Sequence, residues 1–280
     1  MNKTIKSFKT IGGKSRLLPT LLPIIKSSMR ENGLRGFLDL FGGGNKFIPH
    51  LSQYLAPERI YNELDNGISN LMACLTNRQQ TTELLELTYK IRNTINSQAD
   101  LDSANVKRRS EETNQIESAA LTILVSEYSR AADRKIFLKN NVLRGITRGR
   151  LNRYHELVPV MRDVTVTCAS YSYFFDNYND RYDFLAFLDP PYVNSDIYLD
   201  RFGMTEQMDM MKRIVNTQMK VILCGTDNEE YDYLRKSDNC WNKYCLGSIQ
   251  KHSASKHGAM QYEFIWTNFD VNNRKVIKIW

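Results

Sequence analysis

Four residues late in the chain combine hydrogen-bond acceptors with an aromatic ring. Asp189-Pro190-Pro191-Tyr192 follows an apolar run, residues 184–188, that is typical of a buried strand. The two prolines fix φ and remove two backbone donors, so the Asp189 carboxylate and the Pro190 carbonyl remain as acceptors. Acceptors beside an aromatic ring suit an amino group on a flat heterocycle. Taken alone, the segment is also compatible with a simple turn that closes a strand.

A second candidate site lies at a glycine-rich turn near the N-terminus. Residues 37–44, FLDLFGGG, have the pattern of a buried strand that enters a tight turn, and a helix is expected over 45–55. Glycines let a backbone approach a bound cofactor closely. A second strand is expected over 59–64, and Glu63 near its end is placed to accept from ribose hydroxyls. The alternatives are a plain strand-to-helix turn and a surface carboxylate.

Positive charge is concentrated in residues 130–153, which we call the basic segment. The chain has a net charge of +7, and this segment alone has eight basic residues against one acid, Asp133. Such a concentration suits a polyanion such as a nucleic-acid backbone, although a solvated surface without a ligand would have the same composition. The candidate DNA-binding residues are Arg130, Arg134, Lys135, Lys139, Arg144, Arg148 and Arg150.

The elements that must position these residues alternate between strands and helices. Further strands are expected over 164–168, 220–224 and 263–267, and helices over 205–218 and 228–237. This alternation predicts a doubly wound, mostly parallel α/β sheet with helices on both faces. The segment 76–159 is polar and mainly helical by pattern, with helices expected over 82–95 and 111–128. We therefore expect a catalytic domain formed by residues 1–75 and 160–280, and an inserted target-recognition domain formed by residues 76–159.

Composition excludes several classes of protein. No apolar run approaches the roughly 20 residues needed to span a bilayer, and the polar N-terminal residues do not resemble a signal peptide. The five cysteines are irregularly spaced and form no CxxC pair, so neither a zinc site nor a disulfide framework is expected. The four histidines have no metal-binding spacing either. These features predict a cytoplasmic protein without a bound metal.

Four blocks, in one order along the chain, resemble the Dam-like, D12-class branch of the DNA N6-adenine methylases of bacteria and phages. They are Lys9-Thr-Ile-Gly-Gly-Lys14, the turn at 37–44, Asn62-Glu63-Leu64-Asp65 and Asp189-Pro-Pro-Tyr192. Two weaker similarities are Cys168-Ala-Ser-Tyr171 and Glu263-Phe-Ile-Trp-Thr-Asn268. The resemblance covers roughly residues 5–75 and 160–270. It implies a class I methyltransferase fold that uses S-adenosyl-L-methionine.

The resemblance also implies the reaction and the residues of the site. The substrate would be adenine in double-stranded DNA, flipped out of the base stack. Asp189 and the Pro190 carbonyl would accept hydrogen bonds from the adenine amino group, and Tyr192 would stack on the base. The implied catalytic residues are Asp189, Pro190, Pro191 and Tyr192. The implied cofactor-binding residues are Thr10, Ile11, Gly12, Gly13, Lys14, Asp39, Phe41, Gly42, Gly43, Glu63, Leu64, Ser170, Tyr171 and Asp189.

The chain departs from the family's pattern at three places. Thr10 stands where members often have an aromatic residue against the cofactor, and Asn45 stands where many have a glycine. Asparagine tolerates left-handed backbone, which would preserve the turn. Residues 125–149 fall where the family keeps its DNA-reading hairpin, and they differ from its usual pattern. This leaves the target sequence open, with GATC the commonest among relatives, together with the role in restriction–modification, phage protection or regulation.

Three other functions remain open from the sequence. An RNA methyltransferase of the same fold would need the same catalytic residues, because RNA adenine presents the same amino group. A non-catalytic DNA-binding relative would be compatible with the changes at Thr10 and Asn45, although the intact Asp189 and Tyr192 argue against it. A nicotinamide-dependent oxidoreductase would need a fuller GxGxxG pattern than the three glycines at 42–44 provide.

Overall fold

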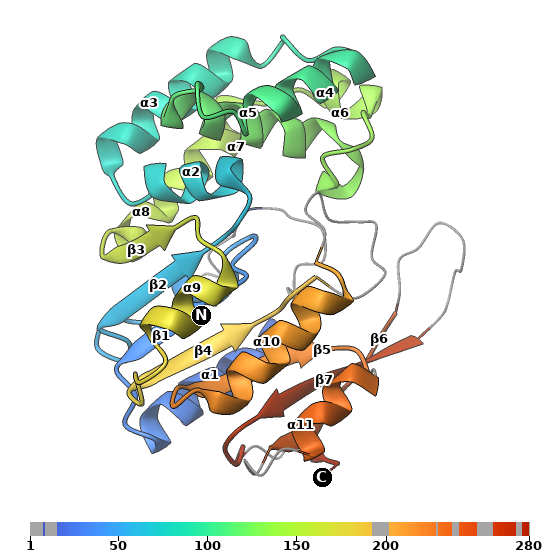
Figure 1. The fold of residues 1–280 in the computed structure, drawn as a ribbon. Coiled ribbons are helices and arrows are strands. Elements are labelled where there is room, and N and C mark those ends of the chain that lie inside the picture. Colours follow the sequence, from blue (N-terminus) through green and yellow to red (C-terminus); the bar gives the residue numbers. More distant parts are fainter. Residues whose placement is uncertain are drawn as a thin grey trace. The chain divides into compact units, whose positions relative to one another are not determined.

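The computed structural model describes residues 8, 16–191, 202–227, 229–236, 241–250, 260–272 and 276–279. Its strands form one eight-stranded sheet in the order β3-β2-β1-β4-β5-β7-β6-β8 (Figure 1). Together with the many helices, this confirms the predicted α/β class. The chain divides into two compact units: unit 1 is Met1–Gly13, Gly42–His50 and Tyr61–Cys168, and unit 2 is Lys14–Phe41, Leu51–Ile60 and Ala169–Trp280.

Unit 2 contains most of the strands. They are β1 (Gly36–Asp39), β4 (Phe184–Leu188), β5 (Lys220–Gly225), β6 (Asn242–Gln250), β7 (Met260–Thr267) and β8 (Ile277–Lys278). β1, β4 and β5 pair in parallel, and β7, β6 and β8 continue the sheet in antiparallel pairs. Every residue of β1 and β4 is buried, which explains why these strands are apolar without alternation.

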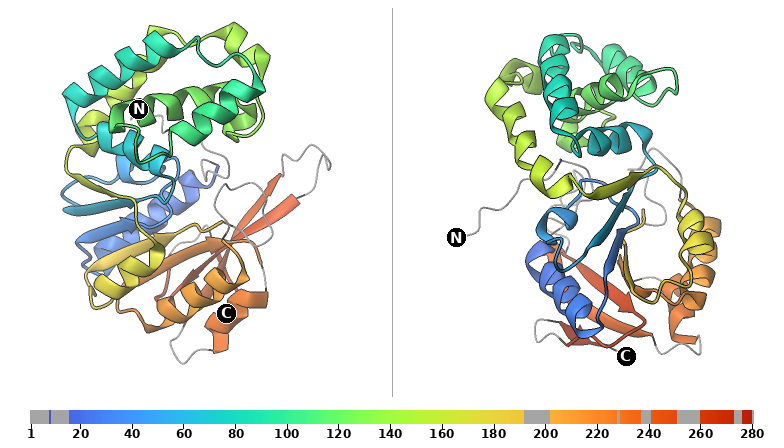
Figure 2. Two further views of the ribbon diagram at one scale, coloured as in Figure 1. Left: turned by 45° about the horizontal axis from the view of Figure 1, so that its top comes forward. Right: turned by 90° about the vertical axis from the view of Figure 1, so that its left-hand side faces the viewer.

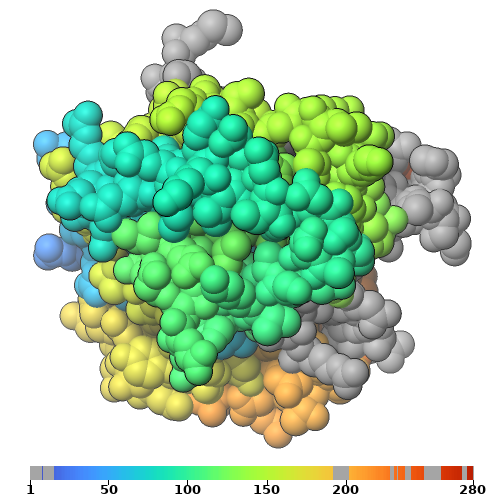
Figure 3. Space-filling model, turned by 90° about the horizontal axis from the view of Figure 1, so that it is seen from above, coloured from blue at the N-terminus to red at the C-terminus, as the bar shows by residue number. Residues whose placement is uncertain are grey.

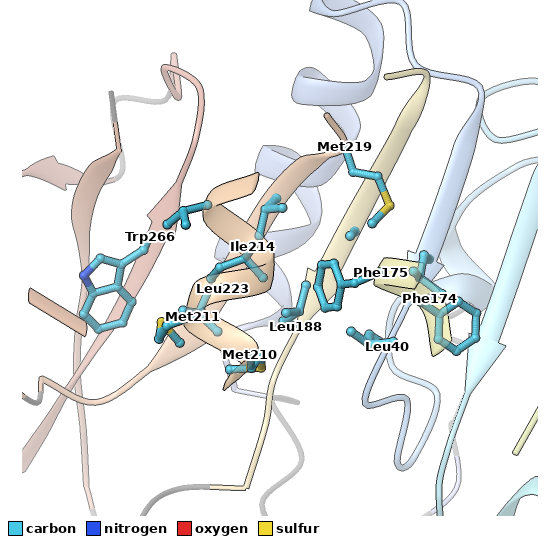
Figure 4. Close-up of a cluster of buried hydrophobic side chains, with 14 of the residues drawn as sticks. Leu40, Phe174, Phe175, Leu188, Met210, Met211, Ile214, Met219, Leu223 and Trp266 are labelled. Carbon is cyan, nitrogen blue, oxygen red and sulfur yellow. The ribbon is translucent and has the colours of Figure 1, made fainter. Parts of the chain in front are cut away.

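Helices cover both faces of this part of the sheet. They are α1 (Leu18–Glu31), α9 (Tyr171–Asn177), α10 (Met204–Asn216) and α11 (Asp232–Lys236), with a 3-10 turn η4 (Glu229–Tyr231). Figure 2 shows α1 on one face and α9 and α10 on the other. The buried face of α10 contributes Met210, Met211 and Ile214 to a core that also includes Leu188 and Trp266 (Figure 4). This core supports the end of β4, from which the candidate catalytic residues follow.

The sequence analysis did not predict β6, and the structure explains why. Gly247 interrupts this strand with a φ of 102°, and the register with β7 shifts between Cys245 and Gly247. A bulge of this kind breaks the alternation of apolar and polar residues on which a strand prediction depends.

Unit 1 is mainly helical. β2 (Glu58–Asn62) enters it from unit 2, and β3 (Val164–Thr167) is its last strand. Its helices are α2 (Asn66–Cys74), α3 (Arg78–Ile91), α4 (Gln98–Lys107), α5 (Gln115–Tyr128), α6 (Lys139–Arg144), α7 (Arg148–Asn152) and α8 (Val158–Met161). Short 3-10 turns occur at η1 (Ile48–His50), η2 (Arg130–Ala132) and η3 (Arg153–Glu156). Within the described residues of the whole chain, no helix is long and apolar enough to cross a membrane.

Side-chain caps determine where the helices of unit 1 begin. Asn77 accepts from the N–H groups of Gln79 and Gln80, so α3 starts at Arg78 instead of the expected residue 82. Asn114 accepts from the Glu117 N–H, so α5 starts at Gln115 instead of residue 111. The α-helix expected over 45–55 was wrong: Asn45 is in a left-handed conformation, and only the turn η1 forms there.

Candidate functional site

The candidate catalytic residues leave the sheet at the carboxyl end of β4. Asp39 closes the neighbouring parallel strand β1, and its register partner on β4 is Phe187. Asp189 lies two residues beyond Phe187, so Asp39 and Asp189 belong to the same edge of the sheet. The carboxyl edge of parallel strands is where open α/β sheets bind their ligands. Asp39 is 2% exposed, Asp189 is partly exposed, and Tyr192 lies outside the described residues.

A buried glutamine, Gln207, holds the candidate catalytic residues in place; we call residues 189–192 the catalytic block. The Gln207 amide on α10 donates a hydrogen bond of 2.8 Å to the Pro191 carbonyl. The Tyr231 hydroxyl donates to the Gln207 side-chain oxygen at 3.2 Å. Gln207 is fully buried, so neither of its polar atoms has water as an alternative partner. Sequence reasoning missed Gln207, because a glutamine on an amphipathic helix usually faces solvent.

Replacement of Gln207 by Leu should slow methyl transfer about tenfold to a hundredfold, because the catalytic block loses the contact that positions it. Stability should also fall by about 1–3 kcal/mol, since buried partners lose their hydrogen bonds. Single-turnover rates measured well below the melting temperature separate the two effects. Gln218→Leu is a matched control, because Gln218 is exposed in the same unit. A wild-type rate in a folded Gln207→Leu variant would contradict a positioning role.

Three aromatic rings lie together in unit 2. The Phe41 and Tyr171 rings stack with centroids 6.5 Å apart, and Phe202 packs edge-on against each of them at 5.5 Å. The Tyr171 hydroxyl donates to Asp209 at 2.8 Å. Burial and this hydrogen bond raise the pKa of Tyr171 well above its usual range, so the hydroxyl stays protonated. The structure thus brings together two predicted cofactor residues and adds Phe202, which the sequence analysis did not identify.

Ser170 precedes this aromatic cluster and begins a helix. Its hydroxyl oxygen accepts from the Ser172 N–H at 3.3 Å, so Ser170 is the N-cap of α9. Ser170 itself is exposed. The cap gives Ser170 a local structural role whether or not it contacts a cofactor.

In unit 1, Glu63 and the glycine-rich turn are joined by hydrogen bonds. The Glu63 carboxylate accepts from the Gly43 N–H at 2.8 Å and from the Asp65 N–H at 3.0 Å. Burial raises the pKa of Glu63, and these two backbone hydrogen bonds act in the opposite direction. Leu64, which follows Glu63, is 53% exposed.

The conformation of the turn depends on Tyr61 of β2. The Tyr61 hydroxyl donates to the Gly43 carbonyl at 2.7 Å. A Cβ added to Gly42 would lie 2.2 Å from the Tyr61 ring, so a side chain cannot fit there. Gly43 has a φ of 46°. Packing within the protein therefore already requires a glycine at position 42, before any cofactor is considered.

Two further residues of this turn, Asn45 and Lys46, have defined roles. Asn45 has a φ of 53°, the left-handed conformation that asparagine was expected to tolerate, and its amide contacts the Met161 sulfur at 2.9 Å. The Lys46 ammonium donates to the Phe8 carbonyl at 2.9 Å, and burial lowers its pKa to about 8. Lys46 thereby anchors the chain close to the predicted cofactor block. The block itself, Thr10, Ile11, Gly12, Gly13 and Lys14, lies outside the described residues.

The predicted DNA-binding residues differ in how accessible their charges are. Figure 3 looks onto a face of the molecule where α3, α4 and α5 are prominent. Four of the seven residues are exposed: Arg130, Lys139, Arg144 and Arg148. Lys135 is partly exposed, and Arg134 is buried.

Two arginines of the basic segment form ion pairs with a glutamate of α5. Arg150 and Arg153 both form ion pairs with Glu127, the second at 2.8 Å, and Arg150 also donates to the Gly145 carbonyl. Arg148 lies 4.4 Å above the Tyr89 ring. Among the described residues, Lys139 and Arg144 form no ion pair. The accessible positive charge of the basic segment is therefore greatest at Lys139 and Arg144.

Each unit thus contributes features of its own: unit 2 has two acids at the carboxyl edge of its parallel strands and a stack of aromatic rings, and unit 1 has a carboxylate bound to a glycine-rich turn. Residues 11–243 match the family described as D12 class N6 adenine-specific DNA methyltransferase. The chain belongs to this family, whose members are enzymes that methylate adenine in DNA. It has no significant match among curated protein sequences. Among the described residues, no group of three or more His, Cys, Asp or Glu side chains could hold a metal ion.

Proposed function

We propose that the protein transfers a methyl group from S-adenosyl-L-methionine to N6 of adenine at a specific site in double-stranded DNA, with the target base flipped out. The main support is the position of Asp189, Pro190 and Pro191 directly after a buried parallel strand, beside the strand that ends at Asp39. Family membership supports DNA and adenine as the substrate class. The order of the strands supports a class I, doubly wound catalytic domain.

The residues present fit the proposed cofactor. Each oxygen of the Glu63 carboxylate accepts from one backbone N–H group, and an ionised carboxylate can accept about four hydrogen bonds. Glu63 therefore retains the capacity to accept from two ribose hydroxyls. Within unit 2, taken by itself, the stacked Phe41 and Tyr171 rings provide apolar surface of the kind on which a flat heterocycle packs. When bound, S-adenosyl-L-methionine supplies an electrophilic methyl carbon attached to a sulfonium.

The proposed chemistry of the protein is mainly positioning and electrostatics. The lone pair of adenine N6 is delocalised into the ring, so this nitrogen is a poor nucleophile. Hydrogen bonds from the amino group to the Asp189 carboxylate and the Pro190 carbonyl would favour a more tetrahedral nitrogen with its lone pair directed at the methyl carbon. Tyr192 would stack on the flipped base. Gln207 would keep the backbone of the block fixed while these contacts form.

Recognition of DNA is assigned to residues 76–159. In this proposal, the exposed residues Arg130, Lys139, Arg144 and Arg148 contact phosphates or read guanine in the major groove. Two aspects of the basic segment support a DNA partner: its excess of positive charge and its location on short helices separated by turns. The boundaries of this recognition domain stay a prediction.

The test is a transfer assay with isotopically labelled S-adenosyl-L-methionine. Unmodified phage DNA and an RNA of mixed sequence are incubated side by side, and the labelled nucleosides are identified after digestion. Label in N6-methyldeoxyadenosine alone is the expected result. Label only in RNA would favour the RNA methyltransferase. If the protein binds DNA but labels neither nucleic acid, it is a non-catalytic relative.

Removal of an exposed charge from the basic segment should weaken DNA binding and reduce its salt dependence. For Lys139→Ala and for Arg144→Ala, the slope of log K against log salt should become less steep by about one, because each variant releases one fewer counterion. Fluorescence anisotropy at several salt concentrations measures the slope. Lys236→Ala on α11 is the control, since this exposed lysine lies outside the basic segment. Unchanged slopes in both variants would remove these residues from the DNA contact.

A further inference from the structure

Arg134 has a buried guanidinium in a segment whose other charges are mostly accessible. The residue is 7% exposed, and its Nε and Nη1 atoms have no hydrogen-bond partner among the described residues. Burial of a charged group without hydrogen bonds is costly, so such groups are rare unless something nearby compensates. Arg134 was predicted to bind DNA, but its burial makes it a poor candidate for a phosphate contact in this conformation.

The loop that contains Arg134 is held by several specific hydrogen bonds. We call residues 129–137 the recognition loop. The Arg134 N–H donates to the Ser129 hydroxyl at 2.9 Å, and the Asn105 amide on α4 donates to the Arg134 carbonyl. Ser129 and Phe137 form a β-bridge across the base of the loop. Arg134 has a φ of 58°, a left-handed conformation that is strained for a residue other than glycine. These contacts direct its side chain into the protein despite that strain.

Asn105 joins Arg134 to a cluster of buried charges: its amide nitrogen donates to the Arg134 carbonyl, and its amide oxygen accepts from Arg108 Nε at 2.9 Å. The cluster includes two carboxylates, Glu63 and Asp65, and both interact with the Arg134 charge. Asp65 is already neutralised, because Arg108 binds both of its oxygens at 2.5 and 2.8 Å. Glu63 accepts hydrogen bonds from backbone N–H groups, and among the described residues its negative charge forms no ion pair. The charge of Arg134 is thus available to balance Glu63, and the two groups come from the recognition loop and from the proposed cofactor site of the same unit.

We propose that Arg134 is a positioning residue that supplies the counter-charge for Glu63 and so links the recognition loop to cofactor binding. This inference rests on the proposed function, in which Glu63 accepts from the cofactor ribose and the basic segment binds DNA. Movement of the recognition loop on DNA would change the distance between the two charges. By thermodynamic linkage, DNA would then change cofactor affinity, and cofactor would change DNA affinity by the same factor.

The inference has a consequence for pH dependence. Burial and the nearby Asp65 carboxylate raise the pKa of Glu63, whereas the two backbone hydrogen bonds and the charge of Arg134 lower it. Burial, and to a smaller extent the charges of Glu63 and Asp65, raise the pKa of the Cys168 thiol, so the thiol stays neutral beside these groups. Without Arg134, the pKa of Glu63 rises further. Since the ionised carboxylate is the form that accepts from hydroxyls, cofactor binding should then be lost at a higher pH on the acid side.

The experiment is calorimetric titration of S-adenosylhomocysteine into the full chain between pH 5 and pH 8, with and without fragments of unmodified phage DNA. Arg134→Met should weaken S-adenosylhomocysteine binding about fivefold to tenfold near pH 6. The loss of affinity in acid, which we call the acid limb of the pH profile, should begin at a higher pH, and DNA should change the affinity less than in wild type. Arg134→Lys should restore the wild-type limb, because it keeps the charge. Arg162→Met is the matched control in the same unit, since that arginine is exposed and lies outside the basic segment. It should leave the acid limb unchanged.

The outcomes separate this inference from the proposed function. If the wild-type protein binds no S-adenosylhomocysteine, or if Glu63→Gln binds it as wild type does, the proposed cofactor site fails. If Glu63→Gln weakens binding while Arg134→Met keeps the wild-type profile and DNA effect, only the inference about Arg134 is overturned. If Arg134→Met does not give the wild-type circular dichroism spectrum, comparison of Arg134→Lys with Arg134→Gln decides. If Arg134→Lys and Arg134→Gln lost affinity for S-adenosylhomocysteine at the same acid pH, the inference about Arg134 would also be overturned.

Discussion

The Asp189→Ala variant should lose methyl transfer by at least about a hundredfold to a thousandfold, the effect expected when one preorganised group is removed from an active site. In the proposed mechanism, the carboxylate is one of two acceptors for the adenine amino group, and the variant leaves only the Pro190 carbonyl. DNA binding should be retained, because Asp189 belongs to unit 2 and the basic segment belongs to unit 1. Single-turnover transfer to phage DNA and anisotropy with labelled DNA measure the two properties.

Two further variants sharpen the Asp189 experiment. Asp189→Asn keeps the size of the side chain and one acceptor oxygen, so it should retain more activity than Asp189→Ala. Asp180→Ala is the matched control, because this exposed carboxylate belongs to the same unit and precedes β4, whereas Asp189 follows the other end of that strand. Near-normal transfer by Asp189→Ala would show that the acceptor is elsewhere, and the assignment of the catalytic block would have to be abandoned.

The largest expected effect on stability comes from the pair of Asp65 and Arg108. Their side chains are 6% and 0% exposed, and the two hydrogen bonds between them join the start of α2 to the residue that follows α4. Asp65→Asn keeps the N-cap of α2, because asparagine caps helices well, but it leaves the Arg108 charge buried without its counter-charge. We expect a loss of about 3–5 kcal/mol in the free energy of unfolding.

Urea denaturation measures this loss, and a neighbouring ion pair provides the control. Lys107 pairs with Glu117 at 2.6 Å, with side chains 57% and 31% exposed. Lys107→Met should therefore change stability by less than about 1 kcal/mol, because exposed pairs are screened by water. If Asp65→Asn were as stable as Lys107→Met, the buried pair would not be a major source of stability in unit 1.

The same pair predicts how stability depends on pH. Burial alone would raise the pKa of Asp65, but the hydrogen bonds and charge of Arg108 outweigh it and hold the pKa at about 2. The unfolded chain has the ordinary aspartate pKa of 3.8. The contribution of Asp65 is therefore complete above about pH 4 and is lost as the pH falls through 2. Wild type should lose this part of its stability in acid, whereas Asp65→Asn should not.

Several features of this protein are determined by the sequence alone, because they depend on residues that are close together in the chain. Continuous apolar runs indicated the buried strands β1, β4 and β5, since a parallel strand covered on both faces needs apolar residues throughout. The motif at Asp189-Pro-Pro-Tyr192 indicated an acceptor-rich site after such a strand. Local backbone chemistry also predicted that Asn45 could take a left-handed conformation.

Other features were decided only by the tertiary structure, because they join residues that are distant in sequence. Gln207 reaches Pro191 from another element, and Asp65 meets Arg108 across 43 residues. Arg134 and Lys139 lie five residues apart in the same basic segment, but only Arg134 is buried. Burial, and with it the strength of an ion pair or the pKa of a carboxylate, depends on what packs around a side chain in three dimensions. A charge pattern along the chain does not contain that information.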